Sequence, residues 1–97
     1  MTLRILSLAL NDLEAGRQFY ELQGTGLGSY FQDALFSDID SLLLYAGVHR
    51  KVFGYHRLLS KRFPFAIYYK VAGDVVDVWR VLDCRRNPSV IAKSLKG

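Results

Sequence analysis

Five arginines and one histidine in the second half of this 97-residue sequence are candidates for chemistry on a phosphodiester. Cleavage of RNA by its own 2′-hydroxyl needs a group that accepts the hydroxyl proton and cations that stabilise the charge building up on the phosphate. The cationic candidates are Arg57, Arg62, Arg80, Arg85 and Arg86. The candidate proton acceptor is His56, because an arginine stays protonated and no Tyr, His, Asp or Glu follows Asn87. A half-exposed strand histidine is the competing interpretation of His56.

Other residues that can do chemistry have plainer interpretations. Cys84 precedes two arginines whose charge would lower its pKa, but neither histidine is placed near it, which favours a half-buried thiol. No spacing of Cys and His suggests a metal site, and no motif implies a cofactor. The glycines of "GTGLGS" (24–29) follow a predicted helix and lack a Lys-Ser/Thr pair, so they predict a turn between helices and not a phosphate loop.

The charge of the sequence is divided unevenly along its length. Residues 1–46 carry two arginines against six acidic residues, a net charge of −4, whereas residues 47–97 carry eleven lysines and arginines against three aspartates, a net charge of +8. This asymmetry indicates a surface for an acidic partner, either nucleic acid or an acidic protein segment. The hydrophobic fraction of 51% predicts one globular domain, residues 1–97. We expect no membrane contact, and the single cysteine favours a cytoplasmic protein.

The N-terminal half predicts a strand and then a helical hairpin. "LRILSL" (3–8) alternates as a short strand does, and Asn11 with Glu14 forms a capping-box pattern for the start of a helix. Apolar residues recur every three to four positions over 29–45, which predicts a second helix. Gly16 should cost about 1 kcal/mol inside the first helix, so we expect it to permit close packing against the second.

The C-terminal half predicts the rest of the sheet. Three runs rich in β-branched and aromatic residues, 51–60, 62–71 and 74–83, are typical of strands, and Pro88 can begin a short helix over 88–96. The fold class is therefore α+β, in the order β-α-α-β-β-β with a possible short C-terminal helix. In this fold a helical hairpin packs on a mainly antiparallel four-stranded sheet.

Alternation within the strands assigns the aromatic stretch "RFPFAIYY" (62–69) mainly to the core. The face expected under the helical hairpin carries Phe63, Phe65, Ile67 and Tyr69. The other face carries Pro64, Ala66, Tyr68 and Lys70. Since base stacking needs exposed aromatic rings, Tyr68 is the one aromatic candidate for a surface contact in this stretch.

Arg80 lies within an otherwise apolar strand. Alternation places it on one face with Val76, Val78 and Leu82, where it needs an open cleft or an acidic partner such as Asp83 or a carboxylate of a bound protein. The residues expected to contact a target or a protein partner are Arg57, Arg62, Tyr68, Arg80, Arg85 and Arg86.

Several motifs, taken in order, resemble the RelE/ParE superfamily of type II toxin–antitoxin toxins. "NDLEAGRQFYELQ" ahead of "GLGSYF" resembles the helix–GLG–helix junction of that family. "YHRLLSKRFPFAIYY" followed by "VVDVWRVLDCRRNP" resembles the ParE-like branch, with its Y-x-R, R-F-P-[YF]-x-[IV]-Y-Y and V-L-x-C-R-R-[ND]-P motifs. The resemblance covers nearly the whole chain.

The resemblance implies a small bacterial or plasmid-borne toxin, of the kind associated with plasmid stabilisation, that a cognate antitoxin neutralises. RelE-like members cut messenger RNA on the ribosome with a basic cluster and, commonly, a C-terminal Tyr or His, whereas ParE-like members are associated with poisoning DNA gyrase. We therefore predict a toxin that inhibits growth by binding a protein target such as DNA gyrase. The alternatives are a ribosome-dependent messenger RNA endonuclease and a decayed toxin that only binds its antitoxin.

Overall fold

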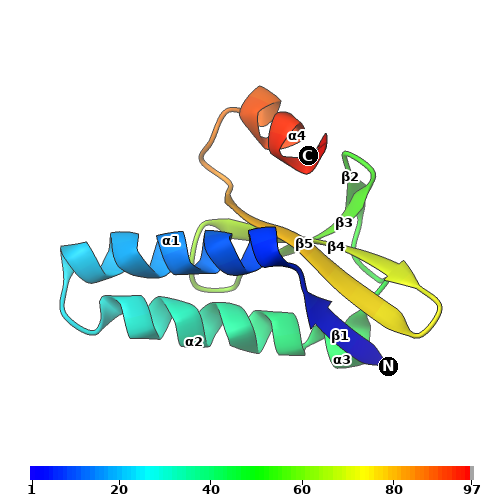
Figure 1. Ribbon diagram of the computed structural model, residues 1–97, viewed down its shortest axis with the longest axis horizontal. Coiled ribbons are helices and arrows are strands. Elements are labelled where there is room, and N and C mark those ends of the chain that lie inside the picture. The colour runs from blue at the N-terminus through cyan, green and yellow to red at the C-terminus, as the bar shows by residue number, and fades with distance from the viewer. Residues whose placement is uncertain (97) are drawn as a thin grey trace.

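The computed structural model describes residues 1–96, which form a five-stranded sheet with helices on both faces (Figure 1). The elements in chain order are β1 (Thr2–Ile5), α1 (Ser7–Gln23), α2 (Leu27–Asp40), α3 (Leu42–Tyr45), β2 (Lys51–Val52), β3 (Tyr55–Leu59), β4 (Phe65–Ala72), β5 (Val75–Asp83) and α4 (Pro88–Lys96). The strands lie in the order β1-β5-β4-β3-β2. Only the β1–β5 pair is parallel. The predicted α+β class is confirmed.

The sheet has five strands where the sequence predicted four, because the run 51–60 folds back on itself. Phe53 and Gly54 both have positive φ angles, 55° and 85°. Two consecutive residues of this kind form the tight turn that joins adjacent antiparallel strands. The turn separates β2 from β3, and Val52 pairs with Tyr55 across it.

Helix α1 begins four residues earlier than the cap predicted at Asn11. The parallel pairing of β1 ends at Ile5, the Leu6 N–H still donates to the Val78 carbonyl at 3.0 Å, and Leu6 is the residue that precedes the helix. Because the helix starts as soon as this pairing ends, Asn11 lies inside α1 and makes no cap. Glu14 pairs with Arg17 instead, at 2.6 Å.

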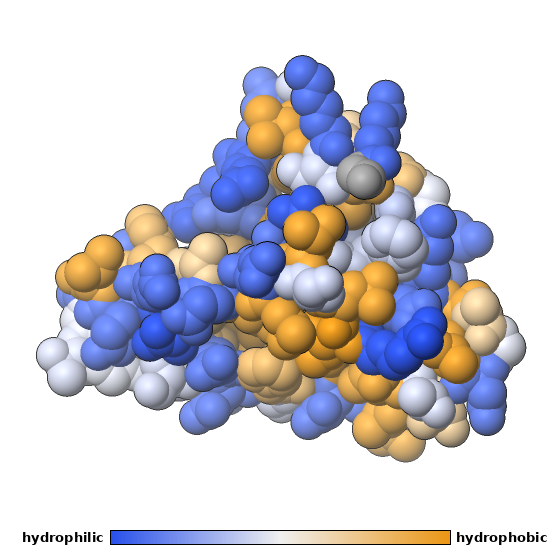
Figure 2. All heavy atoms as spheres, viewed as in Figure 1, coloured by the Kyte–Doolittle hydropathy of each residue, from blue (hydrophilic) through white to orange (hydrophobic). Residues whose placement is uncertain are grey.

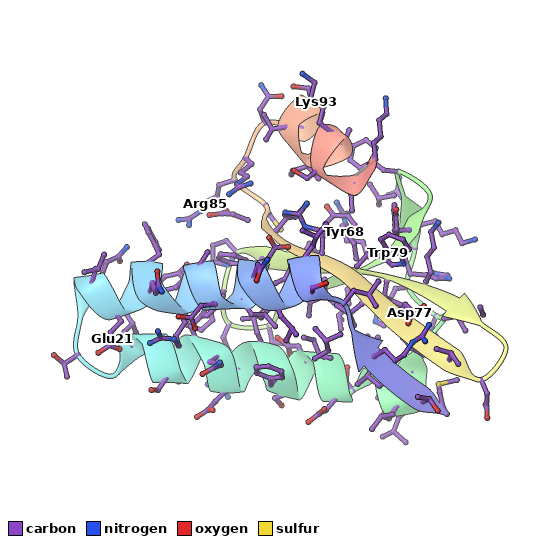
Figure 3. All side chains as sticks on the ribbon, viewed as in Figure 1. Glu21, Tyr68, Asp77, Trp79, Arg85 and Lys93 are labelled. Carbon is purple, nitrogen blue, oxygen red and sulfur yellow. The ribbon has the colours of Figure 1, made fainter. Side chains whose placement is uncertain are left out.

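The glycine-rich segment between α1 and α2 is a helix–helix turn, as predicted. Gly26 has a φ of 85°, and the Glu21 carboxylate accepts hydrogen bonds from the N–H groups of Gly26 and Gly28, the latter at 3.0 Å (Glu21 is labelled in Figure 3). These bonds hold the pKa of Glu21 below its ordinary value. The start of α2, where an external anion would bind, is therefore occupied by a carboxylate of the chain itself.

The helical hairpin of α1 and α2 packs closely on one face of the sheet. A Cβ atom at Gly16 would lie 2.5 Å from Phe31 Cζ, so the helices approach only because residue 16 is glycine, which confirms the predicted close packing. The predicted second helix is divided, since α2 ends at Asp40 and α3 begins at Leu42. The core on this face includes the large buried side chains Leu13, Phe31, Leu35, Ile39, Phe65, Ile67 and Tyr69.

Alternation predicted the faces of β4 correctly and those of β5 only in part. Phe65, Ile67 and Tyr69 face the hairpin, as expected. In β5 the register shifts, because Tyr68 pairs with Arg80 but Tyr69 pairs with Val78. Trp79 is therefore the extra residue of a β-bulge. Beyond the bulge, Val81 joins Val76 and Val78 in the core under the hairpin and Leu82 joins the opposite core, which contradicts the prediction that Leu82 shares a face with Val76 and Val78.

The second face of the sheet is covered by α4, which confirms the short C-terminal helix. Ile91 and Leu95 are buried in a small cluster with Ala66, Tyr68 and Leu82. The Tyr55 hydroxyl donates to the Leu95 carbonyl at 2.9 Å and so holds the end of α4 against β3. Figure 2 shows hydrophilic side chains projecting over α4 at the top of the view, consistent with the exposed Lys93 and Lys96.

Candidate functional site: a groove between α1 and β5

A groove of about 350 Å³ lies between α1 and the C-terminal half of β5. Its floor is formed mainly by the apolar residues Phe65, Val81 and Leu82, its α1 wall includes Ala15 and Phe19, and Arg86 lies at its rim. Phe19 is 49% exposed although it is a large aromatic residue. An open concave surface with aromatic walls and a cationic rim is suited to bind an apolar side chain of a partner protein.

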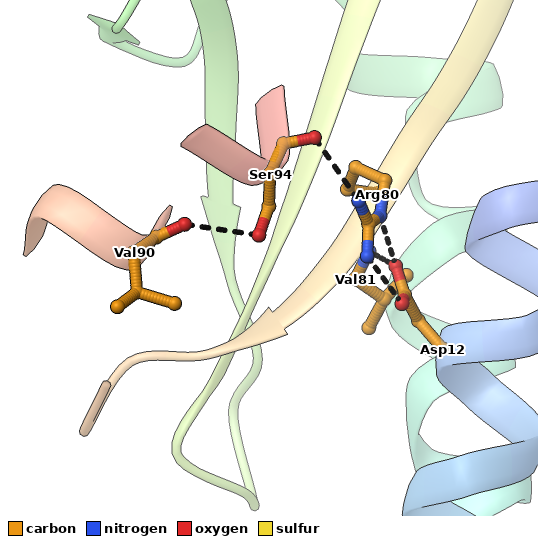
Figure 4. A network of polar contacts seen from close by, with 5 residues as sticks. All are labelled: Asp12, Arg80, Val81, Val90 and Ser94. Carbon is orange, nitrogen blue, oxygen red and sulfur yellow. Dashed lines mark hydrogen bonds and ion pairs between the residues drawn. The ribbon is translucent and has the colours of Figure 1, made fainter. Parts of the chain in front are cut away.

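Asp12, which lines the groove, forms an ion pair that joins α1 to Arg80 of β5 (Figure 4). The Asp12 carboxylate accepts hydrogen bonds from Arg80 Nε at 2.7 Å and Nη2 at 2.9 Å, and from the Val81 N–H at 3.0 Å. Arg80 Nη1 also donates to the Ser94 carbonyl of α4 at 3.0 Å. These contacts raise the pKa of Arg80, mainly through the hydrogen bonds to Asp12. The partner of Arg80 within the chain is thus Asp12, and not Asp83 as the sequence suggested.

Asp83 and Arg86 form the rim of the groove at the end of β5, and Arg85 lies between them in the sequence. Arg85 binds the Asp83 carboxylate with two guanidinium nitrogens, at 2.9 and 2.7 Å, which lowers the pKa of Asp83 (Arg85 is labelled in Figure 3). Within residues 1–96 the Arg86 guanidinium takes part in no ion pair. Arg86 is therefore the cation in the groove that is available for a carboxylate from outside.

Tyr68 and Arg57 lie on the α4 face of the sheet, and Tyr68 is only 2% exposed. Burial is the main reason that the pKa of Tyr68 is raised. This corrects the expectation that Tyr68 is an exposed aromatic contact, because α4 covers the side of β4 that alternation left open. Arg57, opposite Tyr68 in the register, is half-buried in the same region.

Arg62 and His56 lie apart from the groove. Arg62 Nη1 donates to the Tyr30 hydroxyl at 2.9 Å, next to the start of α2. His56 stacks on Tyr69, with ring centroids 5.1 Å apart, and its Nδ1 lies 2.6 Å from the His49 carbonyl, on the hairpin side of the sheet. The structure therefore does not bring the histidine and the arginines proposed for RNA cleavage into one cluster.

The remaining candidate groups also have local explanations. The His49 Nδ1 is hydrogen-bonded to the Tyr69 hydroxyl, and burial lowers the pKa of His49. Cys84 is an exposed residue, yet partial desolvation of its thiol raises its pKa, the opposite of the effect expected from the adjacent arginines. Within residues 1–96 there is no group of three or more His, Cys, Asp or Glu side chains arranged for a metal ion. No helix in this range has the length and apolar character to cross a membrane.

Sequence reasoning missed the contribution of α1 to this site. Asp12, Ala15 and Phe19 recur at three- and four-residue spacing on one side of the helix, and they face the groove. A signal was present, because an arginine within an apolar strand required an acidic partner. It did not indicate which of the nine acidic residues this was, since Asp12 and Arg80 are 68 positions apart.

Comparison with solved structures finds a similar fold in a toxin–antitoxin system. A chain from the structure titled "Chromosomal ParDE TA system from P. aeruginosa" superposes with a TM-score of 0.75 and 22% sequence identity, over 84% of this chain and 92% of that chain. This chain therefore has a ParE-like fold, as the sequence motifs implied. No family model matches the sequence. A search of curated proteins found no match either.

Proposed function

We propose that this protein is the toxin of a type II toxin–antitoxin system and is neutralised by a cognate antitoxin that binds the groove between α1 and β5. The observation that carries the proposal is the groove itself, an open apolar surface with an available arginine at its rim, in a chain with the fold of one from a ParDE system. A surface of this kind suits an antitoxin segment that is disordered alone and folds on binding.

The charge distribution supports the same partner. The half of the chain that contributes β5 and Arg86 has a net charge of +8, from eleven basic and three acidic residues. An acidic segment would be attracted to it over a distance, and apolar side chains would supply the affinity once they are in the groove. We infer an antitoxin segment that combines large apolar residues with carboxylates.

We further propose that the unbound toxin acts in the cytoplasm by binding a protein target, with DNA gyrase as the candidate that the family resemblance suggests. Binding requires no proton acceptor, whereas RNA cleavage does. The geometry favours binding, because His56 lies on the hairpin side of the sheet, while Arg57 and Arg80 lie on the α4 side. The charge and the groove are also compatible with a chain that has lost its target and only binds antitoxin.

The neutralisation is tested by co-expression with the product of a small reading frame adjacent to this gene. We expect the toxin alone to arrest growth, and co-expression to restore it with formation of a stable complex. The matched control is the Phe19→Glu variant, which places a negative charge in the α1 wall of the groove and should prevent rescue. Rescue of this variant to the wild-type extent would show that the antitoxin binds elsewhere.

The target is tested with purified components. We expect the toxin in excess to inhibit DNA supercoiling by gyrase, and the antitoxin to relieve the inhibition. Messenger RNA on ribosomes incubated with the toxin should remain intact. Unaffected gyrase would exclude this target, and cleaved messenger would replace binding with the nuclease activity.

A further inference from the structure

The C-terminal half of β5 is an open edge of the sheet. β1 pairs with β5 only from Thr2 opposite Val75 to Ile5 opposite Val78, and the chain then leaves the sheet to begin α1. Within residues 1–96, the strand β5 continues beyond Val78 to Asp83 with β4 on one side and no strand on the other. Exposed strand edges can pair with an extended segment of another chain.

The hydrogen-bonding pattern determines which groups of β5 point to this edge. The Cys84 N–H donates to the Pro64 carbonyl at 2.8 Å, so the pairs Cys84–Pro64, Leu82–Ala66 and Arg80–Tyr68 are the hydrogen-bonded ones. In an antiparallel ladder such pairs alternate with pairs whose backbone groups point away. Val81 and Asp83 therefore direct their N–H and C=O groups to the open edge.

Two of these four groups are already engaged. The Val81 N–H donates to the Asp12 carboxylate at 3.0 Å, and the Asp83 carbonyl accepts from the Arg86 N–H at 3.2 Å. Among the described residues, no hydrogen bond engages the Val81 carbonyl or the Asp83 N–H, so these two groups remain at the edge. A single residue of a parallel strand can bond to both groups, because its N–H donates to the Val81 carbonyl and its C=O accepts from the Asp83 N–H. An antiparallel strand would need both groups of Val81 or both groups of Asp83, and so would displace an existing bond.

We propose that the antitoxin adds a short strand to this edge, parallel to β5 and in line with β1, with an apolar side chain in the groove. This proposal rests on the toxin–antitoxin function proposed above. The Asp12 carboxylate already accepts the hydrogen bond of the Val81 N–H that a carbonyl of an added strand would otherwise accept. The added strand therefore begins next to the Asp12 side chain. The position opposite Leu82 bonds to the Val81 carbonyl and the Asp83 N–H.

The groove specifies the side chains of the added strand. Neighbouring strands in register direct their side chains to the same face, so the residue opposite Val81 points to the hairpin face, where Phe19 and Phe65 line the groove. A large apolar residue fits there. The residue opposite Asp83 lies beside Arg86, which favours an acidic residue two positions later. The partner is thus an extended segment with the pattern apolar-x-acidic.

Nuclear magnetic resonance of the complex with the adjacent-frame antitoxin tests the strand. We expect the exchange of the Asp83 amide hydrogen to slow by at least about tenfold on binding, as a new ladder bond requires. Nuclear Overhauser contacts should connect Asp83 to the antitoxin in the pattern of parallel strands. Tight binding with an unchanged Asp83 amide, as for a helix in the groove, would overturn strand addition and leave the toxin function intact, and an antiparallel pattern would overturn the direction.

A pair of variants on α1 tests the groove. Ala15→Arg fills the groove from an exposed helix position and adds a positive charge, while Gln23→Arg adds the same charge at the far end of the helix. We expect the Kd for antitoxin to rise about tenfold or more for Ala15→Arg and less than about threefold for Gln23→Arg. Equal affinities would overturn the groove contact. A wild-type toxin that does not bind the antitoxin would refute the proposed function, and strand addition with it.

Discussion

The two faces of the sheet are covered by layers of very different strength. On one face the helices α1 and α2, of 17 and 14 residues, bury a continuous core. In this core the ring centroid of Phe31 lies within 5.1 Å of the ring centroids of Tyr20, Phe63 and Phe65. On the other, the nine-residue helix α4 is anchored by two buried apolar side chains, Ile91 and Leu95. It is also held by hydrogen bonds from Arg80 and Tyr55 to its carbonyl groups.

One layer of the molecule mainly stabilises the fold, while the surface suited to binding a partner lies beside the weaker layer. The hairpin face buries large aromatic rings and supplies most of the apolar burial that stabilises the fold. The edge of the sheet between the two layers, where α1, β5 and the segment before α4 meet, contains the open strand edge, the apolar groove and Arg86. The rigid layer thus positions the groove, while the smaller layer leaves one side of it open.

Removing the central ring of the hairpin face should have the largest effect. Phe31→Ala deletes a side chain with 0% exposure, and we expect the free energy of unfolding to fall by about 3–5 kcal/mol, measured by urea denaturation. The control is Tyr30→Ala, next to it but 45% exposed, which should cost less than about 1 kcal/mol. Equal losses would mean that the hairpin face is not the stabilising layer.

Leu95→Ala, on α4, should cost less, about 2 kcal/mol, because a short helix at the chain terminus can detach without unfolding the sheet. Amide exchange should speed up in α4 and stay slow in β4. The control Val90→Ala removes a side chain that is 45% exposed and should leave both unchanged. Faster exchange throughout β4 would show that the two layers unfold together.

Breaking the connection between the layers should have a smaller effect. Asp12→Ala leaves the Val81 N–H and the Arg80 guanidinium, whose side chain is 17% exposed, without their acceptor. We expect a loss of about 1–2 kcal/mol in the free energy of unfolding. Asp12→Asn keeps an oxygen acceptor and should lose less. If both variants match the wild type in chemical denaturation, the ion pair adds nothing to stability.

The smallest effect is expected at Glu21 in the hairpin layer, whose carboxylate should make the stability of the fold depend on pH in the acid range. Hydrogen bonds from Gly26 and Gly28 lower the folded-state pKa of Glu21. A group with a lowered folded pKa stabilises the fold above its unfolded pKa, and this stabilisation is lost as the pH falls through the folded pKa. Thermal unfolding of Glu21→Gln should therefore differ from the wild type at pH 7 and converge with it below the ordinary range of glutamate. A constant difference across this range would contradict the assignment.

The periodic parts of the fold were predictable because local patterns encode them. The alternation in β4 and Pro88 at the start of α4 placed their elements correctly, and the apolar repeat over 29–45 predicted α2 but not its separation from α3. The start of α1 and the second half of β5 were not predictable, because both depend on pairing between distant residues. Helix α1 starts where β1 stops pairing with β5, and the bulge at Trp79 reverses the alternation beyond it.

The sequence also showed that the candidate site is basic, but not which residues form it or which of its arginines are unpaired within residues 1–96. Arg80, Arg85 and Arg86 were identified as contact residues, and Arg86 lines the groove. Arg80 and Arg85 are paired with Asp12 and Asp83, and Tyr68 is buried. Which cations remain available depends on which carboxylates the fold brings close to them.

By itself, the sequence determined the class of fold, the arrangement of a helical hairpin on a sheet, the core character of "RFPFAIYY" and the basic C-terminal half. These properties follow from hydrophobic periodicity and composition, which act over a few residues at a time. Only the tertiary structure decided that β1 is too short to cover β5, that Asp12 occupies the Val81 N–H, and that α1 and β5 enclose a groove. Each of these depends on contacts between segments more than 60 residues apart in the chain, such as Asp12 and Arg80 at a separation of 68.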